Sequence, residues 1–187
     1  SGSAPTGFKS VIMDVTSTES VDKAFDEIEA QWGIPEIIVA NAGITKDGLV
    51  MRMSDEDFES VIDANLTGAF RVARRATKGL LKLKKGRLIF VGSVVGALGS
   101  AGQVNYSSSK SGLVGMARSF AREIGSRGIG VIVFCIIGLN AFPEIIMADF
   151  LSQHVQNPGT FLIGNPSGNR IRFGRAWSDD AVRRILF

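Results

Sequence analysis

Residues 87–134 read RLIFVGSVVGALGSAGQVNYSSSKSGLVGMARSFAREIGSRGIGVIVF, and this stretch decides the fold. It opens with an apolar run at 87–92 and continues through a loop of glycine and other small residues. Helical spacing of apolar residues follows from about 105 to 125, and a second apolar run occupies 129–134. Apolar strands separated by a covering helix are typical of parallel βαβ units. We therefore predict two parallel strands joined by a helix.

The same alternation of strand and helix extends toward the N-terminus. The expected elements are a strand at 8–15, a helix that begins after Thr16, Ser17 or Thr18 and ends at Gly33 and Pro35, a strand at 36–40, an irregular connection at 47–53, and a long helix from the capping box of Ser54 and Asp57 to about Leu83. This order predicts an α/β fold with a doubly wound, Rossmann-like parallel sheet that is incomplete at the N-terminus.

The domain prediction is one Rossmann-like domain over 1–187. Its core is expected at 8–134, and 135–187 is expected to be a divergent tail. Glycine, proline and asparagine dominate that tail and favour loops, with weak helical patterns only at 141–155 and 179–186.

Composition excludes several classes of protein. The chain has one cysteine, Cys135, and one histidine, His154, so neither a disulfide framework nor a zinc site is expected. The longest apolar run, 131–139, is about half of the roughly 20 residues that a membrane-spanning helix needs. The N-terminal residues show neither a basic nor an apolar leader, which favours a cytoplasmic protein. A net charge of +3 is too small to indicate nucleic-acid binding.

The residues with the clearest chemical meaning are Ser93, Tyr106 and Lys110. Tyr106 and Lys110 are four residues apart on the expected helix, so their side chains share one face. An ammonium within about 4 to 6 Å of a phenol favours the phenolate and makes a tyrosine a better acid–base group. Ser93 ends a strand, where its hydroxyl can hold a substrate carbonyl. The alternative is a surface tyrosine beside a solvated lysine.

In this context the chain resembles the short-chain dehydrogenase/reductase family. Within that family it resembles the 3-oxoacyl-[acyl-carrier-protein] reductases of bacterial fatty-acid synthesis, and its motifs are similar to those of the actinobacterial mycolic-acid branch. The stretches that carry the resemblance are Asp14-Val15, Asn41-Ala42-Gly43-Ile44, Met51-Arg52-Met53, Asn65-Leu66-Thr67-Gly68, and Gly92-Ser93-Val94-Val95-Gly96 continuing to Asn105-Tyr106-Ser107-Ser108-Ser109-Lys110-Ser111-Gly112.

The resemblance implies a role for each catalytic residue. Tyr106 would give its proton to the substrate carbonyl, and Ser93 would hydrogen-bond the same oxygen. Lys110 would favour the phenolate of Tyr106 and bind the nicotinamide ribose. Asn65 would hold a water in a proton relay, a role compatible with its alternative as a kink residue in the long helix.

The resemblance also implies a cofactor site for NADPH, with NADH not excluded. Asp14 would meet the adenine and Val15 would pack beside it, whereas the turn of Asn41, Ala42 and Gly43 would pass under the adenosine. Without the family, Asp14 could be only a cap at the end of a strand.

A second group of candidate functional residues is a basic patch made of Lys82, Lys84, Lys85, Arg87, Arg122 and Arg127. These cations could simply be placed favourably at helix C-termini. In the resembling reductases, the positions of Lys84 and Arg127 face the acidic acyl carrier protein. The resemblance further implies a dimer or tetramer assembled through the two long helices.

Two parts of the family pattern are missing. The family opens with a strand, a glycine-rich loop and a helix that receive the cofactor pyrophosphate, and no such glycine turn occurs here. The first expected strand matches the family's third, so roughly 40 to 60 residues are expected to be absent, more than one βα unit. The family's central strand would be among them, leaving unpaired ladder groups. After 134 nothing aligns with the family's later segments.

Two function classes therefore stay open. The first is an enzyme that reduces 3-oxoacyl thioesters on the carrier protein. Within this class, the alternative is another substrate of the short-chain reductases. The second is a noncatalytic remnant that keeps only the helices used for oligomerisation.

Overall fold

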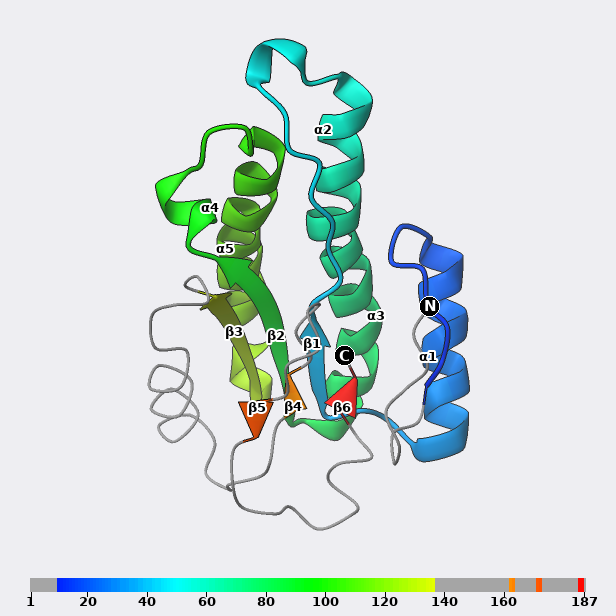
Figure 1. The fold of residues 1–187 in the computed structure, drawn as a ribbon. Helices are drawn as coiled ribbons and strands as arrows, with labels where there is room; N and C mark the ends of the chain where they lie inside the picture. The colour runs from blue at the N-terminus through cyan, green and yellow to red at the C-terminus, as the bar shows by residue number, and fades with distance from the viewer. Residues whose placement is uncertain (1–9, 137–161, 164–170, 173–184, 187) are drawn as a thin grey trace.

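The structure is a computed structural model that describes residues 10–136 and three short strands nearer the C-terminus (Figure 1). The elements are α1 Thr18–Trp32, β1 Ile37–Ala40, the 3₁₀ turn η1 Val50–Arg52, α2 Asp55–Ile62, the π-helical segment η2 Asp63–Thr67, α3 Gly68–Leu83, β2 Gly86–Ser93, α4 Val95–Leu98, α5 Val104–Ile124, the 3₁₀ turn η3 Gly125–Arg127, β3 Ile129–Ile136, β4 Leu162–Ile163, β5 Ile171–Arg172 and β6 Ile185–Leu186.

The main sheet has the strand order β3-β2-β1-β6, and all its paired strands are parallel. The carboxyl ends of β1, β2 and β3 therefore lie along one edge, toward α4 in Figure 1. A separate antiparallel pair joins β4 and β5. The Rossmann-like parallel sheet expected from the sequence is confirmed.

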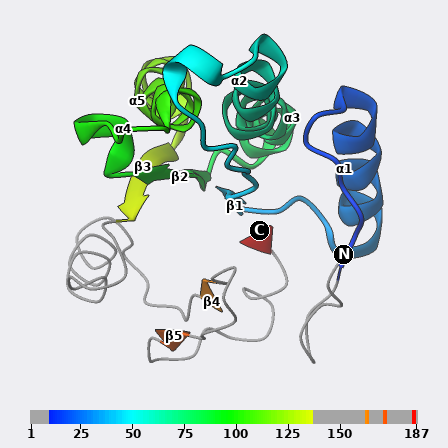
Figure 2. The ribbon, with the colours of Figure 1, turned by 45° about the horizontal axis from the view of Figure 1, so that its top comes forward.

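The helices α1, α3 and α5 lie on one side of the sheet, as Figure 2 shows. Helix α3 contacts β1 and β2, α5 contacts β2 and β3, and α1 packs against α3. Phe25, Ile38, Leu80, Leu88 and Phe90 are almost completely buried in the core between these helices and the sheet. Each such side chain contributes about 1.5–3 kcal/mol relative to an exposed one.

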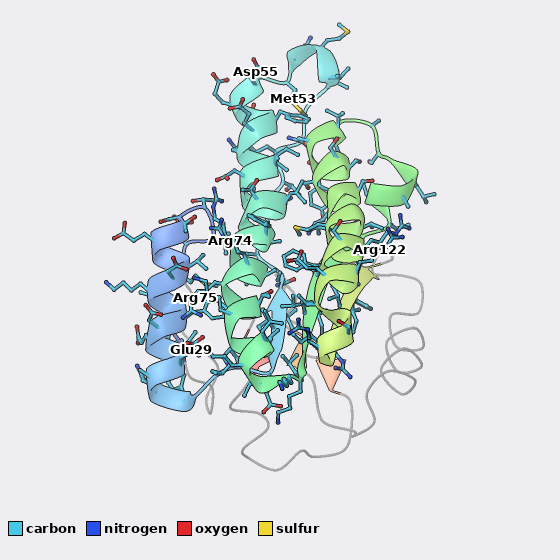
Figure 3. All side chains as sticks on the ribbon, turned by 180° about the vertical axis from the view of Figure 1, so that it is seen from behind. Glu29, Met53, Asp55, Arg74, Arg75 and Arg122 are labelled. Atoms are coloured by element: carbon cyan, nitrogen blue, oxygen red, sulfur yellow. The ribbon has the colours of Figure 1, made fainter. Side chains whose placement is uncertain are left out.

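A buried arginine holds α1 against α3. Arg75 on α3 is 8% exposed, and its guanidinium pairs with Asp26 at 2.7 Å and with Glu29 at 2.8 Å. It also lies 5.2 Å from the ring centroid of Phe25. Figure 3 shows Arg75 reaching from α3 toward Glu29 on α1. The outer helix is thus attached by paired charges as well as by apolar packing.

Local signals placed the helix ends correctly. Ser17 is the N-cap of α1, its hydroxyl accepting a bond from the Ser20 N–H at 3.2 Å, and Gly33 ends the helix at φ 84°. Ser54 likewise caps α2 by accepting from the Asp57 N–H at 3.1 Å. The long helix is interrupted by η2, whereas the sequence predicted a continuous helix.

Two further expectations about secondary structure were wrong. Residues 10–15 form no strand. One side of β1 pairs in parallel with β6, Ile37 with Ile185 and Ile38 with Leu186. Residues 185–186, expected in a weak helix, are that same strand β6. The weak helix at 141–155 and the lone His154 lie outside the described residues.

The pairing of β1 with β6 changes one expectation from the sequence, which was that loss of the family's central strand would leave backbone hydrogen-bonding groups of the sheet unpaired. Ile37 and Ile38 have parallel partners in β6. No helix in the described part of the chain is both long and apolar enough to cross a membrane.

Candidate active site

The carboxyl edge of the sheet brings the end of β2 against α5. Ser93 is the last residue of β2, and its hydroxyl accepts a bond from the Val95 N–H at 3.2 Å where α4 begins. A Cβ on Gly96 would lie only 2.9 Å from the Ser111 backbone nitrogen, so glycine allows α4 to approach α5 closely. The chain just after Ser93 is thereby packed against the turn of α5 that carries Lys110.

Lys110 is buried between α5 and the sheet. Its side chain is 6% exposed, and Nζ donates to the Val91 carbonyl oxygen at 2.8 Å. The same Nζ lies 5.6 Å from the ring centroid of Tyr106. Burial lowers the pKa of Lys110, because desolvation disfavours the ammonium. The structure therefore places Lys110 beside Tyr106, as the spacing predicted, and does not leave it as a solvated surface lysine.

Asn65 ties three segments together from the π-helical turn. It is 1% exposed, and its Oδ1 accepts from the Ile44 N–H at 2.7 Å. Its Nδ2 donates to the Ile44 carbonyl at 3.0 Å and to the Ser109 hydroxyl at 3.2 Å. Asn65 thus fixes the loop that follows β1 against α5, and it sits at the interruption of the long helix, where a kink was one interpretation.

Gly43 passes close to this cluster. A Cβ at this position would lie 3.0 Å from Asn65 Oδ1 and 3.7 Å from Lys110 Nζ. A side chain here would crowd the Asn65 amide, so glycine allows the loop after β1 to pass close to Asn65 and Lys110.

The residues expected at the adenosine end gather on the other side of β1. Val15, Asn41 and Ala42 line one small pocket, together with Met13, Val39, Ala40, Ala69 and Val72. The Val15 carbonyl accepts a bond from Arg71 at 3.2 Å. The sequence therefore selected residues that the fold does bring together.

Asp14 has a local role in this structure. Its Oδ1 accepts from the Thr16 hydroxyl at 2.7 Å and from the Thr16 N–H at 2.9 Å. These bonds hold the pKa of the Asp14 carboxyl below its usual range. Because the side chain is exposed, it remains accessible beside the pocket that Val15 lines. Asp14 is thus a cap of the turn before α1, which is compatible with a ligand contact.

Some of the residues expected to contact a dinucleotide lie together in the described part of the chain. Val15, Asn41 and Ala42 line one small pocket, and Gly43 passes beside Asn65 and Lys110. No glycine-rich turn that could receive a pyrophosphate is found in the described residues. Among those residues, no group of histidine, cysteine and carboxylate side chains could hold a metal ion.

Lys84 and Arg127 lie at the opposite edge of the sheet. Both are exposed, Lys84 at the end of α3 and Arg127 in η3 after α5. Their turns are adjacent, since a Cβ on Gly128 would lie 2.5 Å from the Lys84 carbonyl oxygen. Seven steps of β2 separate this edge from Ser93, roughly 23 Å at about 3.3 Å per residue.

Two buried polar residues near Tyr106 were missed by the sequence analysis. Asn105 and Ser109 are both 0% exposed. The Ser109 hydroxyl donates to the Tyr106 carbonyl at 2.7 Å while accepting from Asn65. An asparagine in the first turn of a helix, next to the only tyrosine of the chain, is a signal that could have found Asn105.

Comparison with known proteins finds relatives that are named as reductases. A 3-oxoacyl-[acyl-carrier-protein] reductase MabA of Mycobacterium tuberculosis (strain ATCC 25618 / H37Rv) is 50% identical over 126 residues, which cover 67% of this chain and 51% of the relative. MabA of Mycobacterium avium is 49% identical over 126 residues, covering 67% and 49%. FabG of Escherichia coli (strain K12), with the same reductase name, is 43% identical over 123 residues, covering 66% and 50%.

The chain spans about half the length of the curated relatives that it matches. A family model described as short chain dehydrogenase matches residues 3–142, which is most of the chain and includes Ser93, Tyr106 and Lys110. The chain therefore belongs to the short-chain dehydrogenase family.

Proposed function

We propose that this chain is an oxidoreductase that uses NADPH to reduce a 3-oxoacyl-[acyl-carrier-protein] to the 3-hydroxyacyl product in cytoplasmic fatty-acid synthesis. The observation that carries the proposal is the placement of a buried Lys110, fixed on the Val91 carbonyl, beside the ring of Tyr106. The names of the relatives, which are 3-oxoacyl-[acyl-carrier-protein] reductases, supply the substrate class.

The chemistry divides among three residues. When bound, the reduced nicotinamide supplies a hydride to the substrate carbonyl. Tyr106 gives the proton that the carbonyl oxygen needs, and Ser93 donates a hydrogen bond to the same oxygen. Lys110 holds the ribose and favours the phenolate left on Tyr106. A positioned proton donor of this kind contributes about 10²–10⁴-fold to the rate.

Asn65 acts on the same site through the loop and the helix that it joins. Its amide binds Ile44 and Ser109, so the loop containing Gly43 and the turn bearing Lys110 keep a fixed relation. We propose that a water beside its Oδ1 links Lys110 to solvent. That oxygen accepts one bond from Ile44 and has a second lone pair for such a water.

The cofactor end of the proposal rests on the residues around β1. Val15, Asn41, Ala42 and Gly43 would hold the adenosine side, with Asp14 meeting the adenine. Support comes from the pocket that Val15, Asn41 and Ala42 share. NADPH rather than NADH is proposed from the family resemblance.

The test is a titration of NADPH against the chain, followed by its oxidation with a 3-oxoacyl thioester. We expect binding, and turnover of the thioester on a carrier protein. Turnover of small carbonyl compounds alone would reassign the substrate within the family. Absence of NADPH binding by the correctly folded chain would overturn the proposed activity.

A further inference from the structure

Asn105 is fully buried, and its whole amide is used in hydrogen bonds. It is 0% exposed in the first turn of α5, directly before Tyr106. Its Oδ1 accepts from the Tyr106 N–H at 2.7 Å, and its Nδ2 donates to the Lys46 carbonyl at 2.9 Å and the Asp57 carbonyl at 3.3 Å. One acceptor and two N–H donors are thereby satisfied, which is what a buried amide requires.

The bond to the Tyr106 N–H matters because the start of α5 lacks an ordinary cap. The first N–H groups of a helix have no partner within the helix, and the N-cap residue Gln103 makes no side-chain capping bond. Asparagine is also a poor helix former, since its side chain competes for backbone groups. Its presence beside Tyr106 is therefore explained by the contacts it makes.

The same turn fastens the loop after β1. The Gly48 N–H donates to the Gly102 carbonyl at 2.8 Å, and Gln103 Nε2 donates to Asp47 Oδ2 at 2.9 Å. These two bonds lie next to the bond from Asn105 to Lys46. Several hydrogen bonds thus connect the loop after β1 to residues 102–105, and Asn105 is the buried residue among those that form them.

Both backbone groups of Tyr106 are held by buried side chains. Asn105 accepts from its N–H, and the Ser109 hydroxyl donates to its carbonyl at 2.7 Å. Ser109 is in turn bonded to Asn65, which holds Ile44. The loop is consequently fixed at Ile44 and at Lys46, on either side of Thr45.

We propose that Asn105 is a positioning residue that holds Tyr106 and the loop at Lys46 in the geometry needed for proton transfer. This inference rests on the proposed function, in which Tyr106 is the proton donor. A misplacement of about 1 Å in a reacting group can cost about 10²-fold in rate. Loss of Asn105 would free the first turn of α5 without removing any reacting atom.

The experiment compares Asn105→Ala with Leu80→Ala in the full chain. Leu80 is 0% exposed on α3, and it packs against Gly86 at the start of β2, at the edge away from Tyr106. Both variants remove a fully buried side chain, so Leu80→Ala controls for lost stability. We expect kcat to fall about 10²-fold in Asn105→Ala, and to stay near the wild-type value in Leu80→Ala at temperatures where both are folded.

A second readout does not need turnover. Tyr106 is the only tyrosine in the chain, so isotope-labelled tyrosine gives a ring signal that reports this residue alone. We expect that signal to shift or broaden in Asn105→Ala and to remain in place in Leu80→Ala. If Asn105→Ala does not fold, Asn105→Ser, whose hydroxyl can still bond one carbonyl, takes its place in the same comparison.

The outcomes separate the two proposals. An Asn105 variant with the kcat and the ring signal of Leu80→Ala would overturn the inference and leave the proposed function intact. A wild-type chain that binds no NADPH and turns over no thioester would overturn the proposed function, and the catalytic inference with it. The ring signal would still tell whether Asn105 holds Tyr106 in place.

Discussion

The two edges of the parallel sheet carry polar residues in opposite ways. Four of the five buried polar side chains among the described residues lie around the carboxyl edge: Asn65, Asn105, Ser109 and Lys110. Every one of them is hydrogen-bonded. At the opposite end of the sheet, where the parallel strands begin (the amino edge), Lys84 and Arg127 are exposed at the ends of helices.

The difference shows where the fold tolerates expensive groups. Burying an amide or an ammonium costs free energy unless hydrogen bonds replace the lost water, so such groups persist only where several partners converge. Exposed cations near helix C-termini cost nothing and gain typically about 0.3–1 kcal/mol. The carboxyl edge is therefore built around fixed polar groups, whereas the amino edge offers only surface charge.

The largest expected effect is at the carboxyl edge, in Tyr106→Phe. This change removes the proton donor alone, so turnover of the thioester should fall by about 10²–10⁴-fold. The ring is only partly buried, and stability should change by less than about 0.5 kcal/mol. Steady-state kinetics and a parallel NADPH titration measure the two effects, and NADPH binding should be largely retained. A variant with wild-type turnover would remove Tyr106 from the mechanism.

A second change at the same edge, Lys110→Met, links activity to pH-dependent stability. Turnover should fall because the ribose and the phenolate of Tyr106 lose their cation. Burial lowers the pKa of Lys110 in the folded chain below the ordinary 10.5. At a pH between that lowered pKa and 10.5, the unfolded chain therefore binds more protons than the folded one. The Lys110 contribution to stability therefore rises with pH through this window.

Urea unfolding at increasing alkaline pH measures that contribution. The wild-type chain should show a rise that Lys110→Met lacks, superimposed on the behaviour common to both. Equal pH profiles for the two chains would mean that Lys110 is solvated in the folded protein. Lys110 would then be no different from the exposed cations of the amino edge, and it would no longer distinguish the two edges.

The smallest effect is expected at the amino edge, from the double variant Lys84→Glu and Arg127→Glu. If these cations receive an acidic carrier protein, reversing them should raise KM for a carrier-bound thioester by about fivefold, equivalent to about 1 kcal/mol. A thioester on a small thiol should react unchanged and serves as the control. Equal kinetics on both substrates would leave the two cations as stabilisers of helix ends.

Local patterns in the sequence were sufficient for much of this molecule. The sequence offered Thr16, Ser17 or Thr18 as the cap of α1 and Gly33 near its end, and Ser17 and Gly33 hold those places, because capping depends on neighbouring backbone groups. The spacing of Tyr106 and Lys110 placed them on one helix face for the same reason. The strand-end position of Ser93 worked because parallel strands share one carboxyl edge.

Longer-range relations escaped the sequence. The expected strand at 8–15 is absent over 10–15, whereas residues 185–186, expected in a weak helix, pair with β1 as β6. A strand needs a partner elsewhere in the chain, which a local pattern does not identify. The sequence offered a kink at Asn65 as one interpretation, but it did not predict the π-helical turn or the bonds of the Asn65 side chain to residues 21 and 44 positions away. Asn105 went unnoticed because its partners at Lys46 and Asp57 lie 59 and 48 residues back.

The sequence by itself determined the order of the main strands and helices from α1 to β3, the identity of the tyrosine–lysine pair and the family resemblance. These depend on spacing, composition and short-range hydrogen bonds. Only the tertiary structure decided that Lys110 is buried on the Val91 carbonyl, and that Asn65 bonds Ser109, which with Asn105 holds the backbone of Tyr106. Burial and long-range bonds arise when helices dock on the sheet, which no local pattern specifies.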